Sequence, residues 1–267
     1  MKHNTKHKIG TNWLVGVAMF SALAFLITFV VRFPVIFLTF DAKDAVIAIA
    51  SFMYGPVSAV VISLIAALLE LLTVSSTGIY GFIMNFLSSA VFSFVASLIY
   101  SRRKSFGAAV FGLYFSVIIL TGVMMVLNLY ITPLYMGVDR TAVVQLLPTV
   151  LLPFNFAKAM LNAGLALFFY KPCVKAMRRA GLMKPSHTAQ IKEASAPKAP
   201  AGGASLAVTA DGEQTDKWWN TQTEKSVTSV SNVPENKKLT LTPTKLAFIL
   251  SAVTIAISAG IFLWLVL

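Results

Sequence analysis

The sequence contains few charged residues: Asp, Glu, Lys and Arg make up 12% of its 267 residues, whereas a soluble domain carries about 25%. Hydrophobic residues make up 57%, and the mean hydropathy is +0.77. The chain has one cysteine, Cys173, which excludes an internal disulfide framework. These values exclude the soluble globular class and predict an integral membrane protein.

Motifs for enzymatic chemistry are also missing. No GxxxxGK[ST] phosphate-binding loop occurs in the sequence, so we expect that the chain cannot drive transport with ATP by itself. His3, His7 and His187 lie in polar tails and not in apolar segments, which argues against a metal cluster. The paired carboxylates of a hydrolase are absent as well. The sequence therefore predicts no catalytic residues, no metal and no resident cofactor.

The net charge of +12 is concentrated at the ends of apolar segments. Basic residues precede the first segment, separate the fourth from the fifth, and follow the sixth. Such clusters mark the cytoplasmic ends of membrane helices, so we expect a cytoplasmic N-terminus and no nucleic-acid partner. On this assignment the outer loops carry six charged residues: Arg32, Asp41, Lys43, Asp44, Asp139 and Arg140.

Six apolar segments fill residues 13–171, at about 13–31, 44–54, 56–72, 79–100, 107–131 and 147–170. The second is too short to span a bilayer upright, because a spanning helix needs about 20 residues. We expect it to be a partial or tilted element inside the bundle. Gly55-Pro56 separates it from the third segment, since Pro suits the first turn of a new helix.

The fold class predicted is an all-α integral membrane protein, with a six-helix bundle and an appended C-terminal transmembrane helix. We expect residues 1–12 to form a cytoplasmic tail and residues 13–180 to form the six-helix membrane domain. Residues 181–244 lack a sustained apolar period, which predicts a disordered cytoplasmic linker. Residues 245–267 are long and apolar enough to span. The sequence leaves open whether this helix is an anchor or docks on a partner.

Asn155, Lys158 and Asn162 are spaced as i, i+3 and i+7 in the sixth segment, so they share one helix face. A lysine near mid-bilayer costs about 2.5–3.5 kcal/mol, so this stripe must face protein or a polar cavity. One interpretation is a buried ion pair between Lys158 and Glu70 that only neutralises charge. The other is that Asn155 and Lys158 donate hydrogen bonds to carbonyl and ring-nitrogen acceptors of a ligand.

Other residues are weaker candidates. Glu70 in the third segment, Asn128 in the fifth and Asn85 in the fourth can join a binding site. A lone membrane asparagine, however, is more often a helix–helix contact. Tyr80 is placed to stack on a flat ring. Ala18 and Ala22 form a small-xxx-small pair, which permits close packing within the bundle or docking of a partner membrane protein.

Residues 10–180 resemble the substrate-binding S components of energy-coupling factor (ECF) vitamin transporters, most of all the riboflavin-specific type. The motifs are FxxGPxxAxxxxLI from Phe52, STGIYGFIMNF, and PFNFAK followed by FFYKP. The resemblance implies that Asn155 and Lys158 contact the isoalloxazine ring and that Asn128 contributes. It also implies that the alanine motif of the first helix docks on the transmembrane coupling protein, the T component.

This resemblance implies riboflavin, or FMN, as the transported ligand, two ATP-binding subunits as further partners, and a multi-pass location in a bacterial plasma membrane. The chain departs from the pattern in its linker and seventh helix, and in Glu70 within AALLELLTVSSTG. The alternatives are an S component for thiamine, folate or pantothenate, a non-transporting scaffold, and a secondary transporter, which the scarcity of intramembrane ionisable residues disfavours. Deleting residues 182–267 distinguishes a transporter from a scaffold. A transporter core is expected to keep ligand binding after the deletion, whereas a scaffold would lose the segment that recruits its partners.

Overall fold

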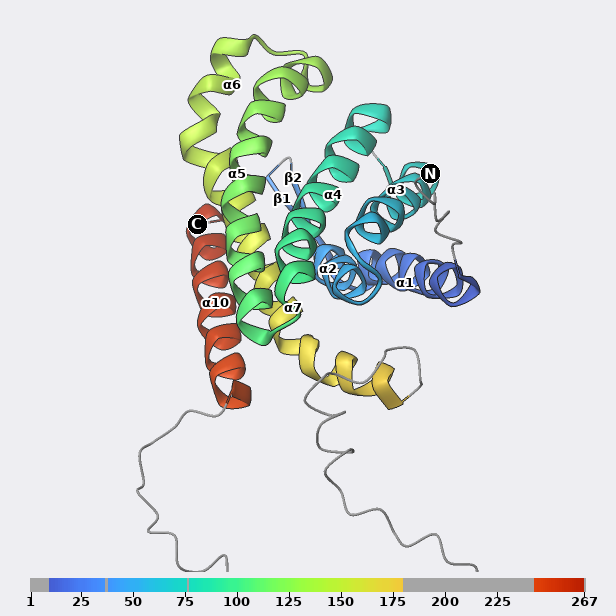
Figure 1. The fold of residues 1–267 in the computed structure, drawn as a ribbon. Coiled ribbons are helices and arrows are strands. Elements are labelled where there is room, and N and C mark those ends of the chain that lie inside the picture. Colours follow the sequence, from blue (N-terminus) through green and yellow to red (C-terminus); the bar gives the residue numbers. More distant parts are fainter. Residues whose placement is uncertain (1–9, 37, 76, 180–242, 267) are drawn as a thin grey trace, which may run out of the picture. The chain divides into compact units, whose positions relative to one another are not determined.

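The computed structural model describes residues 10–36, 38–75, 77–179 and 243–266 (Figure 1). Residues 1–9 of the predicted tail and residues 181–242 of the predicted linker lie outside the described residues. The account below concerns the membrane bundle and the C-terminal helix.

The chain folds into helices with one small hairpin between the first two. The elements are α1 (Thr11–Val30), β1 (Arg32–Val35), β2 (Leu38–Asp41), α2 (Lys43–Tyr54), α3 (Pro56–Thr73), α4 (Gly78–Arg103), α5 (Phe106–Met136), α6 (Arg140–Leu146), the π-helical turn η1 (Leu147–Leu151), α7 (Leu152–Arg179) and α10 (Pro243–Val266). The antiparallel hairpin pairs Arg32 with Asp41 and Val35 with Leu38.

The predicted all-α membrane class and its C-terminal transmembrane helix are confirmed. In the part of the chain that the structure describes, six helical stretches are long and apolar enough to cross a membrane: α1, α3, α4, α5, the stretch from α6 to α7, and α10. Helix α2 has 12 residues and is not among them. The hairpin β1–β2 was not predicted, because its residues were assigned to an irregular outer loop.

Two glycines end helices, of which the sequence predicts Gly55. Gly55 has a φ of +95°, which a side chain would disfavour, and its N–H donates to the Ser51 carbonyl. Pro56 then starts α3 at a position where a missing N–H costs nothing. Gly137 ends α5 in the left-handed conformation. These breaks set the lengths of α2 and α5.

Contacts between helix ends show that successive elements alternate in direction. At one end of the bundle the Tyr100 and Tyr170 hydroxyls lie 2.8 Å apart, and the Phe52 ring packs on Tyr100. At the other end the Thr28 hydroxyl donates to Glu70. Helices α1 and α3 therefore run one way, and α2, α4 and α7 run the other way. The short α2 completes its crossing only together with the hairpin that precedes it.

Helix α2 lies in the centre of this arrangement. Nine of its residues are buried, including Lys43 and Asp44 at its start. It packs against α1, α3, α4 and α7. The prediction of a partial element inside the bundle agrees with this position.

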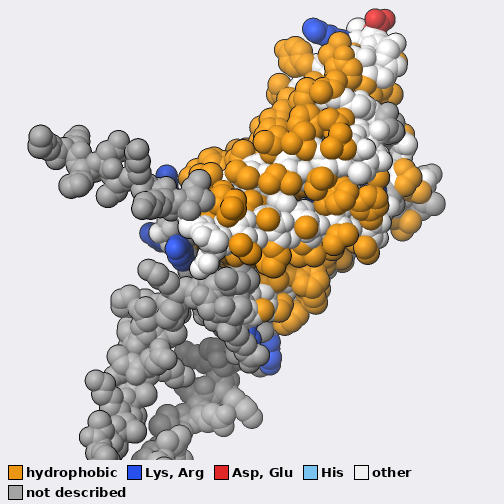
Figure 2. Space-filling view, turned by 90° about the vertical axis from the view of Figure 1, so that its right-hand side faces the viewer, with side chains coloured by type: hydrophobic (Ala, Val, Ile, Leu, Met, Phe, Trp, Pro, Cys, Tyr) orange, Lys and Arg blue, Asp and Glu red, His pale blue; other side chains and the backbone are white. Residues whose placement is uncertain are grey.

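The outer surface of the bundle is apolar. Large exposed hydrophobic side chains occur on all the long helices, and Figure 2 shows one face covered by them, with the Lys and Arg side chains near its ends. A soluble protein rarely exposes an apolar patch of this extent. The surface suits a lipid environment.

The crossing of α4 and α5 depends on Gly112. A Cβ atom built there would lie 2.8 Å from the Ala96 carbonyl oxygen, which is backbone and cannot rotate away. A Cβ built on Gly122, in the same helix, would meet nothing within 4 Å. The two positions form a matched pair.

We predict that Gly112→Ala lowers the free energy of unfolding by about 1–3 kcal/mol, the usual cost of overpacking. Gly122→Ala is expected to be neutral or slightly stabilising, since Ala is the better helix former. Thermal unfolding of both variants in one detergent measures the difference. Equal melting temperatures for the two variants would contradict this account of the α4–α5 contact.

Candidate ligand-binding site

A cavity of about 160 Å³ lies between the hairpin and helices α1, α3, α4, α5 and α7. Five of the six predicted ligand-binding residues line it: Asn85, Asn128, Asn155, Lys158 and Glu70. Tyr80 is not part of the lining and is 37% exposed. Its ring-stacking role stays a prediction. Among the described residues, no cluster of three or more His, Cys, Asp or Glu side chains is arranged to hold a metal ion.

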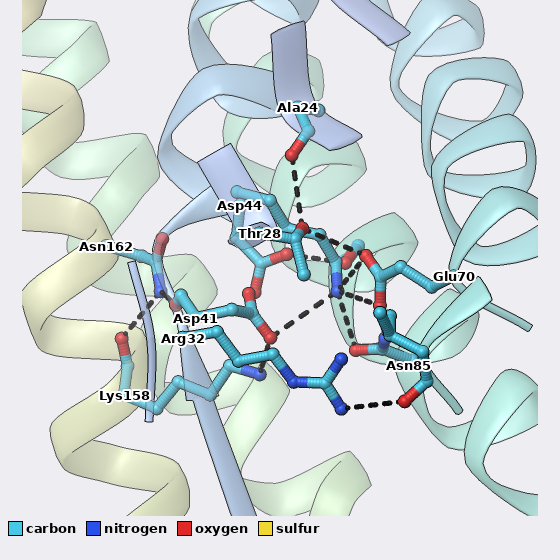
Figure 3. Close-up of polar contacts among 12 residues, drawn as sticks. Ala24, Thr28, Arg32, Asp41, Asp44, Glu70, Asn85, Lys158 and Asn162 are labelled. Atoms are coloured by element: carbon cyan, nitrogen blue, oxygen red, sulfur yellow. Dashed lines mark hydrogen bonds and ion pairs between the residues drawn. The ribbon is translucent and has the colours of Figure 1, made fainter. Parts of the chain in front are cut away.

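Lys158 on α7 points toward the hairpin and forms an ion pair with Asp41, with 2.8 Å between Nζ and Oδ2 (Figure 3). The interpretation that Lys158 pairs with Glu70 is therefore wrong. Glu70 pairs instead with Lys43, at 2.8 Å. The reason is the hairpin, which carries Asp41 into the bundle between the two sides of the cavity.

Three charged residues assigned from sequence to an outer loop are in fact buried. Asp41, Lys43 and Asp44 are 3%, 0% and 1% exposed. The clue is the length of the second apolar segment. A helix too short to span begins inside the bundle, so the charges that flank its start lie inside as well.

Lys43 uses its donors within the protein. Its Nζ bonds Glu70, lies 2.8 Å from Asn85 Oδ1, and lies 3.4 Å from Asp41. Glu70 accepts further hydrogen bonds from Thr28 and from the Asn85 amide. An ammonium has three donors, so the Lys43–Glu70–Asn85 group is a satisfied internal network on one wall of the cavity.

Asn162, the deepest member of the stripe, holds the start of α2. Its Oδ1 accepts from the Ala45 N–H at 2.9 Å, and its amide donates to the Asp41 and Lys158 carbonyls. The first N–H groups of a helix have no partner within the helix, and Asn162 supplies one from α7. It is not part of the cavity lining, which agrees with the packing role that its depth suggests.

Asn155 on α7 and Asn128 on α5 both line the cavity. The Asn155 amide donates to the Leu151 carbonyl at 2.7 Å, beside the π-helical turn η1. π-helical turns are rare in proteins, and those that occur often lie at functional sites. The Asn128 amide donates to the Met124 carbonyl, and its oxygen accepts from Thr132.

Asp41 retains an unused acceptor. Its Oδ1 atom is buried and finds no hydrogen-bond partner among the described residues. The Asp41 carboxylate is paired with the ammonium groups of Lys158 and Lys43, and nearby opposite charges favour the ionised form of a carboxyl. The carboxylate is therefore charged, and a buried charged oxygen without a donor is costly. A ligand N–H can remove that cost.

Asp44 lies at the start of α2, and the Ser89 hydroxyl donates to its carboxyl. The first turn of α2 is a favourable place for a negative charge.

The predicted docking pair lies on the outward face of α1. Ala18 and Ala22 are exposed, whereas Gly16 on the other face approaches Tyr54 so closely that a Cβ would overlap its ring. Close packing within the bundle therefore uses Gly16, and the structure excludes that role for the alanine pair.

Comparisons with known proteins agree with this architecture. Residues 12–170 match the family model described as "ECF transporter, substrate-specific component". The chain is 29% identical over 176 residues to the riboflavin transporter RibU of Staphylococcus aureus (strain TCH60), covering 62% of this chain and 92% of that protein. A solved structure of the S component of a bacterial ECF transporter matches with a TM-score of 0.54 and 29% identity, over 62% of this chain and 96% of that one.

Helix α10 lies beyond the family match, which ends at residue 170. The match covers more than half of the chain, and the cavity and the short α2 both fall within it. The chain belongs to the family of substrate-specific components of ECF transporters.

Proposed function

We propose that this protein captures riboflavin at the outer side of a bacterial plasma membrane and delivers it to an ATP-driven coupling module. The observation that carries the proposal is the polar set at the cavity: the Lys158 ammonium, the Asn155 amide and the free Oδ1 of Asp41. The imide edge of an isoalloxazine ring offers an N–H between two carbonyls. The cavity offers donors beside an acceptor, which is the complementary pattern.

The apolar lining suits the rest of the ring. Leu38, Phe82, Met84, Met124 and Phe154 line the cavity together with the polar set. Ligand sites commonly combine apolar walls with a few placed polar groups. A flat aromatic ligand fits this lining better than pantothenate, which has no ring.

The cavity must widen to admit a flavin. Its volume of about 160 Å³ is below the roughly 300–1,000 Å³ of typical ligand sites. The ligand then replaces or shares the Asp41–Lys158 hydrogen bond.

The orientation and partners follow from charge and surface. The cavity lies at the end of the bundle away from Arg102 and Arg103, which close α4, and basic ends favour the cytoplasm. This supports a cytoplasmic N-terminus and a site open to the outside. The exposed Ala18 and Ala22 face is the proposed docking surface for the T component, which joins two ATP-binding subunits. We infer that the chain itself catalyses no reaction.

We predict that the purified full chain quenches riboflavin fluorescence with micromolar or tighter affinity. Lys158→Met is expected to weaken binding roughly 30-fold or more, since removing one partner of a buried charged hydrogen bond costs about 2–5 kcal/mol. Asn155→Ala keeps every charge and is expected to weaken binding by about tenfold. Lys171→Met, on the same helix but not in the cavity lining, is the control and leaves affinity unchanged.

Competition with FMN, thiamine, folate and pantothenate in the same titration tests the alternatives. If riboflavin does not bind and one of these vitamins does, the riboflavin assignment is wrong and the architecture still stands. A chain that binds none of them favours the membrane scaffold.

The two lysines of the site are expected to differ in role. We predict that Lys43→Met lowers the free energy of unfolding by about 3–5 kcal/mol, because it leaves Glu70 buried without its counter-charge. Adding Glu70→Gln removes that charge and is expected to recover part of the loss. Thermal unfolding without ligand measures both variants. The division of roles is incorrect if Lys43→Met melts like the unmodified chain and only loses flavin binding.

A further inference from the structure

Helix α10 packs along α7 in the antiparallel direction. Near the start of α10, the Phe248 ring lies 5.4 Å from Phe168, and near its end the Phe262 ring lies 5.9 Å from Phe154. Between these contacts, a Cβ built on Gly164 would lie 3.1 Å from Ile255 Cγ1. In Figure 1 the red α10 lies on the side of the bundle away from α1.

The buried face of α10 carries small and polar residues and ends in an aromatic residue: Ala247, Ser251, Thr254, Ser258 and Phe262. The Tyr114 hydroxyl on α5 hydrogen-bonds the Thr254 hydroxyl. A tyrosine hydroxyl facing lipid would have no partner, which is costly in hydrocarbon. The surfaces of α5 and α7 thus match α10, which behaves as a fixed part of the bundle and not as a loose anchor.

The end of α10 reaches the back of the cavity wall. The Phe262 ring contacts Phe40 on β2 at 5.0 Å with an interplanar angle of 81°, and it also contacts Phe154 on α7. These three rings belong to one buried cluster with Val35 and Ala157. Phe40 directly precedes Asp41, and Phe154, itself part of the cavity lining, directly precedes Asn155.

We propose that α10 is a positioning element of the binding site and that Phe262 is its positioning residue. By holding Phe40 and Phe154 together, Phe262 fixes the hairpin against α7 and so sets the distance from Asp41 to Lys158 and Asn155. Pre-organised polar groups bind a ligand more tightly, because less order is lost on binding. This proposal rests on the proposed function, since it concerns the same cavity.

Deletion of residues 182–267 removes α10. The sequence alone predicts that the remaining core keeps ligand binding. Without α10, Phe40 and Phe154 lose the Phe262 ring that contacts both, so the truncated chain is expected to bind flavin more weakly than the full chain.

The test uses the full chain and two neighbouring substitutions on α10. Phe262→Ala is expected to raise the riboflavin dissociation constant about tenfold, mainly through faster dissociation, as loss of pre-organisation implies. Trp264→Ala is the matched control, because Trp264 is 66% exposed on the same helix end, and it leaves the constant unchanged. Gly164→Val on α7 forces α10 away from its groove and is expected to reproduce the Phe262→Ala effect.

A ligand-free readout keeps this proposal separate from the proposed function. Amide hydrogen exchange in residues 38–41 is expected to be faster in Phe262→Ala than in Trp264→Ala, whether or not flavin binds. If the unmodified chain binds no flavin, the proposed function fails and this exchange difference alone decides the positioning role. Should Phe262→Ala and Trp264→Ala match the unmodified chain in both affinity and exchange, the positioning role is overturned. Phe262→Leu replaces the alanine variant if the latter does not fold.

Discussion

The structure depends on how charges are paired inside an apolar bundle. Lys43 and Lys158 share the interior with Asp41, Asp44 and Glu70. Each of these groups would be costly if buried alone. The hairpin places Asp41 between the two lysines, so that Lys43 serves the wall formed by Glu70 and Asn85 while Lys158 faces the cavity. As a result, the Asp41–Lys158 ion pair lies at the cavity. Its Asp41 Oδ1 atom has no hydrogen-bond partner among the described residues.

The short α2 makes that pairing feasible. A helix that starts in the middle of a membrane protein exposes N–H groups where no water can satisfy them. Asn162 solves this by accepting from Ala45 while also donating to the Asp41 carbonyl. One side chain therefore caps α2 and fixes the end of the hairpin. The residues of the stripe on α7 therefore have different roles: Asn155 and Lys158 line the cavity, and Asn162 holds the start of α2.

The sequence predicts the long helices well because hydropathy is a strong local signal over 20 residues. The sequence also predicts the polar stripe of Asn155, Lys158 and Asn162, because a lysine in an apolar helix must face protein or a polar cavity. The partners of Lys158 and Lys43 were not predictable, since ion pairs across 27 or 117 residues depend on the hairpin that brings them together. The docking of α10 was hidden for another reason. An apolar helix has the same composition whether it faces lipid or protein, and only its buried serines and Gly164 on α7 mark the contact.

These constraints together determine what the site can discriminate. A pocket built to hydrogen-bond a ligand rejects analogues that leave its polar groups unpaired by as much as 10⁴–10⁵-fold, whereas an apolar wall distinguishes an added methylene only weakly. The Asp41 oxygen and the Lys158 ammonium lie at one edge of the cavity, so selectivity is greatest for the ring edge that meets them. Riboflavin and FMN share that edge and differ only at the far end of the ribityl chain. Under the proposed function, the polar set selects the flavin ring and does not distinguish riboflavin from FMN, so any preference between the two has to arise elsewhere in the cavity.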